Sequence, residues 1–284
     1  MNANVEHSQP PAAVPPPGAM RLLQPLRAMP AAFAHATPCS SCRVRESCLP
    51  GHLSAATMQA LDHVVIGRRR LRAGEVLVRE ADPMRYLYAV RVGTLKAATI
   101  LNDGREQVGA FLLAGDLFGF DAFARGAHQR SVIALEDSEV CSIPFGELMR
   151  LPAQANGELA WRISELAGGE LTRDQHLFAI TALRNVEPRL AAFLLWMSRR
   201  MQERGFSGTE FELRMSRAEI GSFLRVTLES VSRAFTALAE QGLIGVAKRR
   251  VRIVSAAGLA GLCTPAMPAR GCDEGETAPR QWHA

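Results

Sequence analysis

Three cysteines, Cys39, Cys42 and Cys48, lie within ten residues of one another, and Cys141 follows 93 residues later. Cysteine thiolates in sets of four are the usual ligands of iron–sulfur clusters and of structural zinc. The sequence therefore predicts a metal or cluster site made by a short loop and one distant residue. The five-residue gap between Cys42 and Cys48 is longer than most zinc fingers use. An iron–sulfur cluster, zinc and a chance grouping of cysteines all remain open at this point.

The cysteines are not expected to form disulfides. The first residues lack the basic and apolar segments of a secretory signal, and no run of about eighteen apolar residues marks a membrane span. We therefore expect a cytoplasmic protein with no membrane partner and with reduced thiols. Cys263 and Cys272 fall in a tail rich in glycine, alanine and proline, and we interpret them as incidental thiols.

The basic charge of the chain is concentrated in one segment. The 284 residues include 33 Lys and Arg against 28 Asp and Glu. Residues 186–256 contain 12 basic and 7 acidic residues, whereas residues 39–185 contain 17 of each. An excess confined to one segment is typical of a module that meets a polyanion, and nucleic acid is the commonest one.

This basic segment has the pattern of a helix-turn-helix. Ser216 and Glu219 match a capping box, and Thr227 is a plausible N-cap of the following helix. On that helix Leu228, Val231, Phe235 and Leu238 are spaced to face a core. The opposite face would present Glu229, Ser232, Arg233 and Thr236. Such a polar face suits a recognition helix in the major groove, although it is also compatible with a merely solvated surface.

Two short β runs, Leu243–Val246 and Val251–Val254, follow the predicted recognition helix. Lys248, Arg249 and Arg250 lie in the connection between them. A hairpin with cations at its tip would form a wing that contacts phosphate. The sequence thus predicts double-stranded DNA as a partner of residues 186–256.

Residues 156–184 carry a long helical pattern without proline. Ala167, Leu171, Asp174 and Phe178 follow a 4-3-4 spacing and would form one stripe on this helix. In a parallel homodimer, Asp174 would meet its own copy in a partly desolvated seam, and the like charges would repel. The alternative is an exposed acid on a helix surface.

The elements that must position these residues indicate an α+β fold. Short apolar runs cut by glycine between residues 57 and 147, and the turn Asn102-Asp103-Gly104, predict a β-roll of the jelly-roll type. The chain divides into a Pro-rich, disordered extension (1–38), a cysteine loop (39–56), a β-roll sensor domain (57–155), a dimerisation helix (156–185), a winged helix-turn-helix (186–256) and a flexible tail (257–284).

The order of these elements strongly resembles the FNR branch of the CRP/FNR family of bacterial transcription regulators. The resemblance runs from about Cys39 to Val254. It is carried by Cys-x2-Cys-x5-Cys-Leu-Pro at 39–50, Gly-Asp-Leu-Phe-Gly-Phe-Asp-Ala at 115–122, Val-Cys-Ser-Ile-Pro-Phe at 140–145, Arg-Leu-Ala-Ala-Phe at 189–193 and the helix-turn-helix from Met215 to Arg233. The resemblance implies a cyclic-nucleotide-binding-like jelly roll, a dimerisation helix and a C-terminal winged helix-turn-helix.

The resemblance also implies a function. It implies an oxygen-labile [4Fe–4S] cluster held by Cys39, Cys42, Cys48 and Cys141, and a cytoplasmic homodimer that binds a palindromic operator. It implies that Glu229, Ser232 and Arg233 read TTGAT-type half-sites and that the bound dimer recruits RNA polymerase to genes of low-oxygen metabolism.

One departure from the wider family bears on ligands. The cyclic-AMP-binding relatives carry a Glu where this chain has Phe120, although Arg130-Ser131 resembles their phosphate-binding pair. An apolar ring does not accept a hydrogen bond from ribose, so we expect no cyclic nucleotide. Arg130 is then interpreted as a surface charge or a retained anion site.

The sequence leaves two alternatives to a redox-gated regulator. One is a regulator of the same fold with zinc or no metal at the cysteines, which responds to another small ligand. The other is an iron–sulfur electron carrier or enzyme. It is disfavoured because no Rossmann or Walker motif and no catalytic Cys/His constellation is found, and we expect no enzymatic activity.

Overall fold

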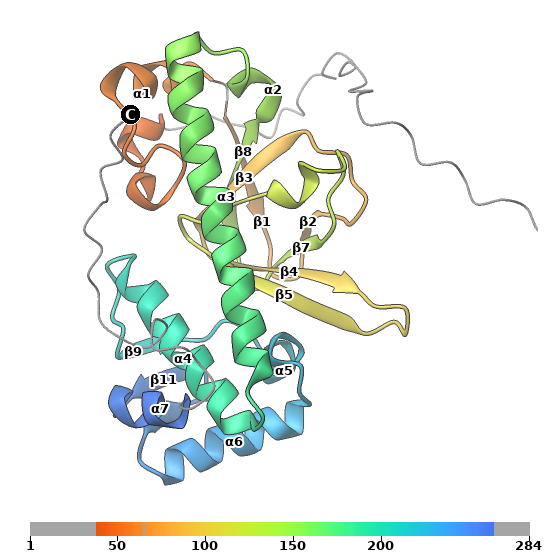
Figure 1. Cartoon of the computed structure of the whole chain (residues 1–284), viewed down its shortest axis with the longest axis vertical. Coiled ribbons are helices and arrows are strands. Elements are labelled where there is room, and N and C mark those ends of the chain that lie inside the picture. Colours follow the sequence, from red (N-terminus) through yellow and green to blue (C-terminus); the bar gives the residue numbers. More distant parts are fainter. Residues whose placement is uncertain (1–37, 65, 264–284) are drawn as a thin grey trace, which may run out of the picture. The chain divides into compact units, whose positions relative to one another are not determined.

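The computed structural model describes residues 38–64 and 66–263 (Figure 1). Its first large unit is an antiparallel β-roll, the β-domain, built from two four-stranded sheets with the orders β1-β8-β3-β6 and β2-β7-β4-β5. The strands are β1 (Gly67–Leu71), β2 (Val76–Val78), β3 (Tyr86–Val92), β4 (Thr94–Ile100), β5 (Glu106–Leu113), β6 (Leu117–Phe118), β7 (Ser131–Ala134) and β8 (Ser138–Pro144). Apolar side chains of both sheets, such as Val90, Leu112 and Val132, share one core, which confirms the predicted β-roll.

Strands β4 and β5 form the hairpin predicted from Asn102-Asp103-Gly104, and it projects at one side of the β-domain in Figure 1. Gly104 has φ +81°, a conformation that glycine adopts without steric cost. Its amide donates to the carbonyl of Leu101 over 2.9 Å, and the side chain of Asp103 accepts from the amide of Arg105. The turn residues therefore fix the hairpin as expected.

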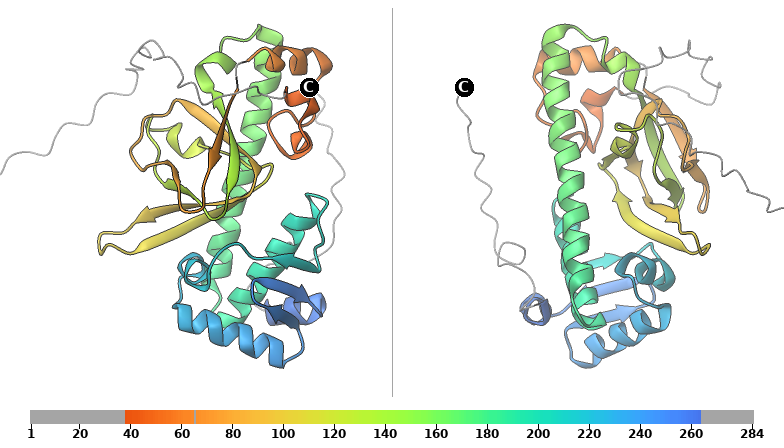
Figure 2. Two further views of the ribbon diagram at one scale, coloured as in Figure 1. Left: turned by 180° about the vertical axis from the view of Figure 1, so that it is seen from behind. Right: turned by 45° about the vertical axis from the view of Figure 1, so that its right-hand side comes forward.

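The long helix α3 (Ala153–Ala182) runs beside the β-domain, as both views of Figure 2 show. It begins after Pro152 and ends at Leu183, whose backbone is extended. Leu159 and Ile163 of its N-terminal half pack in a core with residues of β3 and β8, and with the short helices α1 (Ala55–Asp62) and α2 (Phe145–Leu148) around it. The helix predicted over 156–185 is thus present, shifted by three residues.

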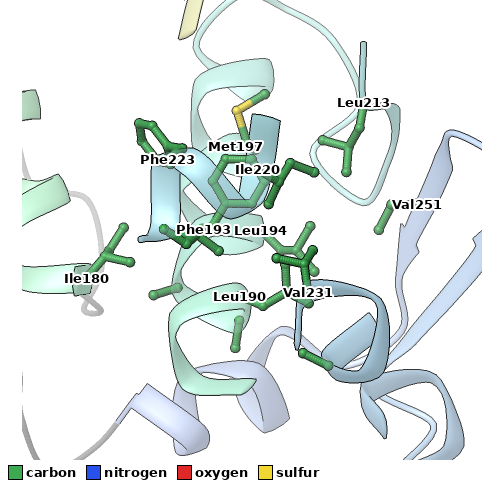
Figure 3. Packing of buried hydrophobic residues seen from close by; sticks show 14 of the residues in the cluster. Ile180, Leu190, Phe193, Leu194, Met197, Leu213, Ile220, Phe223, Val231 and Val251 are labelled. Carbon is green, nitrogen blue, oxygen red and sulfur yellow. The ribbon is translucent and has the colours of Figure 1, made fainter. Parts of the chain in front are cut away.

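The C-terminal domain has the predicted helix-turn-helix and hairpin. Its elements are α4 (Val186–Gln202), β9 (Glu210–Glu212), α5 (Arg217–Leu224), α6 (Leu228–Glu240), β10 (Ile244–Ala247), β11 (Arg250–Ile253) and α7 (Ala256–Cys263). The capping box of Ser216 and Glu219 and the N-cap at Thr227 form as expected. Figure 3 shows the core, in which Phe193, Phe223 and Val231 from three helices meet.

Two expectations for this domain were wrong. Leu228, which was predicted to face the core, is 46% exposed because it lies at the first position of α6, beyond the edge of the core. The tail was predicted to be flexible from residue 257, yet residues 256–263 form α7. Leu259 and Cys263 are buried against α4, so Cys263 is a core residue. The Pro-rich residues 1–37 and the end of the chain, including Cys272, lie outside the described residues.

Helix α5 covers the exposed edge of β5. The hydroxyl of Ser222 accepts from the amide of Val108 over 2.8 Å and donates to the carbonyl of Glu106 over 2.7 Å. Lys96 on β4 extends this contact, since its ammonium lies 3.0 Å from Glu219 of the capping box. The first helix of the helix-turn-helix is therefore fixed to the sheet of the β-domain.

A buried ion-pair network makes a second link. Asp116, at the turn before β6, pairs with Arg200 in the last turn of α4 and with Arg204 just after that helix, and all three side chains are at most 10% exposed. Arg200 also donates to the carbonyl of Phe111 over 2.8 Å. Because buried charges are tolerated only when they are paired, this network makes the contact between β-domain and α4 specific.

Candidate cysteine centre and DNA interface

The four predicted cysteine ligands come from two parts of the fold. Cys39 begins the 3-10 turn Cys39–Ser41, Cys42 follows that turn, and Cys48 follows the turn Arg45–Ser47. Cys141 lies in the middle of β8, where it pairs with Arg68 of β1 and Ala89 of β3. The structure thus brings the cysteine loop against the sheet that carries Cys141.

The four thiols share one neighbourhood. Cys48 is buried, Cys39, Cys42 and Cys141 are half-buried, and Cys39 and Cys141 pack against the same core as Cys48. Burial, together with the nearby Cys141, Asp62 and Cys42, raises the pKa of Cys39 to about 12. Burial is also the main cause that raises the pKa of Cys48 and Cys141. Thiols so close that their charges interact are a sulfur-rich donor set.

No ready-made metal site is present among residues 38–64 and 66–263, because no three His, Cys, Asp or Glu side chains there are arranged to hold one metal ion. Two arginines border the cysteines instead. The charge of Arg68 lowers the pKa of Cys39 and Cys141, and Arg91 interacts with Cys42 while it donates to Glu139 over 2.7 Å. Positive charge beside the sulfurs favours their thiolate forms.

Helix α3 holds the chain at the last cysteine of the loop and again six residues later, at Ser54. Arg162 donates from Nη2 to the carbonyl of Cys48 over 3.0 Å. One turn earlier, Glu158 accepts from the amide of Ser54 over 2.6 Å and from its hydroxyl over 2.7 Å. The cysteine loop is therefore attached to the helix that was predicted to dimerise.

The predicted seam of α3 is largely exposed. Leu171 and Phe178 are 61% and 73% exposed, and Ala167 and Asp174 are half-buried. Trp161, which the sequence analysis did not single out, is 74% exposed on the same helix. Asp174 has a partner within the chain, since Arg130 lies 3.1 Å away. Sequence reasoning missed this ion pair, because no spacing relates residues on a strand end and a distant helix.

The predicted DNA-reading face of α6 is formed as expected. Val231, Phe235 and Leu238 are buried, and the opposite side exposes Glu229, Ser232, Arg233 and Thr236. Hydrogen bonds from its own backbone amide and from Thr227 hold the pKa of Glu229 below its usual range, so the carboxylate is charged at neutral pH. The face thus offers one anion, one cation and two hydroxyls in the first turns of a helix.

Both strands of the wing have the predicted length of four residues, but β10 begins one residue later and β11 one residue earlier than predicted. Strand β11 already begins at Arg250, and Lys248 at the turn has φ +57°. Lys248, Arg249 and Arg250 are all exposed. Arg250 lies 3.4 Å from Glu210, and Arg249 donates to the carbonyl of Arg214, also over 3.4 Å. These long, exposed contacts leave the cations accessible to phosphate.

Comparison with known proteins agrees with this architecture. Residues 68–155 match the family model of the cyclic nucleotide-binding domain, and residues 188–262 match that of the Crp-like helix-turn-helix domain. The fumarate and nitrate reduction regulatory protein of Salmonella typhimurium is 37% identical over 79% of this chain and 89% of its own length. The chain belongs to the CRP/FNR family. It is therefore a DNA-binding transcription regulator, and this family consists of regulators rather than enzymes.

Two further relatives place the chain within the CRP/FNR family. The transcriptional regulatory protein btr of Bordetella pertussis is 40% identical over 79% of this chain and 92% of its own length. The solved structure of FixK2 from Bradyrhizobium japonicum is 30% identical, with a TM-score of 0.65, over 72% of this chain and all of that chain. No helix in residues 38–64 and 66–263 is long and apolar enough to cross a membrane.

The family's nucleotide-binding region is altered in this chain. Phe120 packs edge-on against Phe123, with ring centroids 5.6 Å apart. Arg130, which resembles the phosphate-binding arginine of the cyclic-AMP-binding members, is engaged by Asp174. The absence of cyclic nucleotide binding stays a prediction, and this ion pair is an observation in its favour.

Proposed function

We propose that this CRP/FNR regulator responds to oxygen or redox state through a [4Fe–4S] cluster held by Cys39, Cys42, Cys48 and Cys141. The cluster would control homodimerisation along α3, and the dimer would bind a palindromic operator and recruit RNA polymerase. In the cytoplasm, such a regulator would serve genes of anaerobic or low-oxygen metabolism. The observation that carries the proposal is that one helix, α3, contacts the cysteine loop and also presents an exposed apolar seam.

The residues fit a cluster in their chemistry. Four sulfurs are the donor set of a [4Fe–4S] cluster, and when bound the cluster supplies reactivity toward oxygen. The bordering Arg68 and Arg91 would offset the negative charge of four thiolates. The Nε of Arg91 is buried without a hydrogen bond in the described part of the chain, so this N–H group could donate to an anionic group bound at the cysteines. The FNR-type relatives, at 37% identity, support the same assignment.

The seam supports a dimer that depends on the cysteine site. Leu171 and Phe178 expose apolar surface that a second copy of α3 would bury. Asp174 in this seam would place two carboxylates near each other, although Arg130 partly neutralises each one. A dimer of such marginal stability would respond to a small change at the N-terminal half of α3.

DNA reading would fall to Glu229, Ser232 and Arg233 on α6. Arg pairs with guanine through two hydrogen bonds, and a carboxylate accepts from the cytosine amino group. The exposed Thr236 and the wing residues Lys248, Arg249 and Arg250 would contact the backbone and contribute affinity that falls with salt. TTGAT-type half-sites are the expected target because of the likeness to the FNR branch.

Anaerobic purification tests the proposal. We expect a brown protein with iron and sulfide in equal amounts, which binds a palindromic TTGAT-type operator and loses colour, dimer and binding in air. Cys48→Ser should abolish all three, whereas Cys263→Ser, a cysteine outside the site, should abolish none. A colourless zinc protein, or a protein whose operator binding ignores air, would overturn the proposal in favour of a regulator that senses another ligand. A brown protein with no affinity for DNA would point to an electron carrier.

A further inference from the structure

We infer that Arg162 is the positioning residue that couples the cysteine loop to α3, so that the state of the cysteine centre is transmitted to the dimer seam through the carbonyl of Cys48. This inference rests on the proposed cluster and goes beyond it, because it assigns the coupling to one side chain. Arg162 is not a ligand, and it would act only through the loop and the helix.

The contact between Arg162 and the loop is buried. The Arg162 side chain is 8% exposed, and its Nη2 donates to the carbonyl of Cys48 over 3.0 Å. The amide of Gly51 donates to the same carbonyl over 3.1 Å. Two donors therefore fix the orientation of the peptide group that leaves Cys48, the most buried of the four cysteines. A change in the position of Cys48 would alter this hydrogen bond directly.

The loop is shaped to admit the guanidinium. A Cβ added to Gly51 would lie 2.8 Å from Arg162 Nη2 and 2.3 Å from the carbonyl oxygen of Glu46. A side chain at position 51 would therefore displace either the arginine or the loop. Leu49, the residue after Cys48, is fully buried and packs in one core with Leu159 and Ile163 of α3. The glycine, the carbonyl and the arginine form one tightly packed unit.

The charge of Arg162 is incompletely paired. Its Nη1 lies 2.8 Å from Glu165, a carboxylate that is 55% exposed, and its Nε is buried without a hydrogen bond among the described residues. Burying a guanidinium with an unsatisfied donor costs free energy of folding. A negatively charged centre at the four cysteines would offset part of this cost. The arrangement thus suits a loop that binds an anionic group.

The turn of α3 that contacts the loop lies just before the seam, since Arg162 precedes Ala167, the first seam residue, by five residues. Trp161 immediately precedes Arg162 and is 74% exposed, while Arg162 and Ile163 are buried. A displacement or rotation of this turn by the loop would therefore move Ala167 and Leu171, the next seam residues along the same helix. The coupling needs no separate pathway, because one helix carries both contacts.

The test compares Arg162→Met, Arg162→Lys and the matched control Arg150→Met, which makes the same change at an exposed arginine. All are purified without air as full-length, cluster-loaded proteins. We expect Arg162→Met to lose its visible absorption in air roughly tenfold faster than wild type, because mutating residues that support the ligands of a metal site typically weakens metal binding by about tenfold or more. Its anaerobic dimer fraction in sedimentation should also fall. Arg162→Lys should recover part of both effects, and Arg150→Met should match wild type.

A second variant keeps the test decisive if Arg162→Met does not fold. Gly51→Ala retains the arginine and should accelerate bleaching by displacing it from the Cys48 carbonyl. Hydrogen exchange of the cluster-free Gly51→Ala protein, compared with cluster-free wild type, should show residues 45–53 and 153–166 losing protection together. The inference would be overturned if Arg162→Met and Gly51→Ala both bleach and dimerise like wild type. It would also be overturned if neither Gly51→Ala nor Arg162→Lys differs from wild type. A wild-type protein without iron would instead refute the proposed function itself.

Discussion

Arg130, at the start of β7, donates from Nη2 to Oδ2 of Asp174 on α3 over 3.1 Å, and so joins the β-domain to the proposed dimer seam. The Arg130 and Asp174 side chains are 26% and 39% exposed, so the pair is worth roughly 0.2–1 kcal/mol. Its importance lies in the charge that it brings to the seam. Arg130 reduces the repulsion that two copies of Asp174 would exert on each other.

The first prediction follows from this pair. Asp174→Ala should give a dimer that persists in air, because it removes the seam carboxylate. Arg130→Gln should weaken the anaerobic dimer, because it leaves that carboxylate without its cation. Sedimentation equilibrium in the presence and absence of air measures both effects. If Asp174→Ala is monomeric in air, the carboxylate does not oppose dimerisation.

The exposed apolar residues of α3 give a second prediction. Leu171→Ser and Phe178→Ser should abolish dimerisation while they change the unfolding free energy of the monomer by only about 0.5 kcal/mol, because neither side chain is buried in one copy. Urea unfolding of the cluster-free protein and sedimentation of the loaded protein separate the two effects. Phe206→Ser, at an exposed residue outside α3, is the control and should leave the dimer intact. A dimer that survives both seam substitutions would place the interface elsewhere.

Glu170 predicts a dependence of stability on pH. Burial, helped by the nearby Asp174 and Asp121, raises the pKa of Glu170 to about 7, although Arg130 and Arg173 act to lower it. Its Oε2 has no hydrogen bond within the described residues. The folded pKa exceeds the unfolded value of about 4.3. The contribution of Glu170 to the free energy of unfolding is therefore fully present below about pH 4 and is lost as the pH rises through about 7.

Glu170→Gln should remove this loss. The variant should match wild type near pH 4.5 and be more stable at pH 8 by roughly 1–3 kcal/mol, as measured by urea unfolding. Glu240→Gln, at an exposed position of α6, should show no such divergence. Parallel pH profiles of wild type and Glu170→Gln would show that Glu170 is ionised without cost in the folded chain.

Asp116 should respond to pH in the opposite sense. Burial acts to raise its pKa, but Arg200 and Arg204 outweigh burial and hold the pKa below the usual range. Its contribution to stability is therefore present above the unfolded pKa of about 3.9 and is lost as the pH falls below it. Asp116→Asn removes the buried carboxylate shared by two guanidinium groups, of which Arg204 keeps only a 3.8 Å contact with the exposed Glu203, and should destabilise the protein by about 3–5 kcal/mol at pH 7. Asp103→Asn, in the exposed hairpin turn, is the control; equal stability of the two variants would contradict the assignment.

The basic residues of the DNA-binding domain divide into two classes. Arg233→Ala should cost roughly 1–3 kcal/mol of operator affinity and relax discrimination at one base pair. Arg249→Ala should weaken binding to all DNA sequences alike. It should also reduce the slope of log affinity against log salt concentration by about one. Titrations of fluorescent duplexes at several salt concentrations measure both quantities. The division fails if Arg249→Ala changes sequence preference.

The helix-turn-helix could be predicted from the sequence because its determinants are local. The capping box of Ser216 and Glu219, the N-cap Thr227 and the spacing of Val231, Phe235 and Leu238 all act within one or two turns. Leu228 was misplaced because the same spacing continues past the point where the core ends. The spacing of apolar residues predicts which side of a helix faces the core. It does not predict at which residue of the helix the contact with the core ends.

The polar links between distant segments could not be predicted in this way. Arg162 and Cys48 are 114 residues apart, and Arg200 and Asp116 are 84 apart. A buried hydrogen bond between such residues leaves no repeat in the sequence, because only its two ends are constrained. The cysteines were visible because a rare residue type was concentrated in ten positions, whereas arginine is common throughout this chain.

The cover that Ser222 and α5 provide for β5 has a consequence for the isolated β-domain. Without the C-terminal domain, the amide of Val108 and the apolar side chains of Phe111 and Leu113 would be presented to solvent along an unpaired strand. Such an edge is a template for pairing with another chain. A fragment truncated after α3 is therefore expected to aggregate through β5, and a lysine in place of Val108 should keep it soluble.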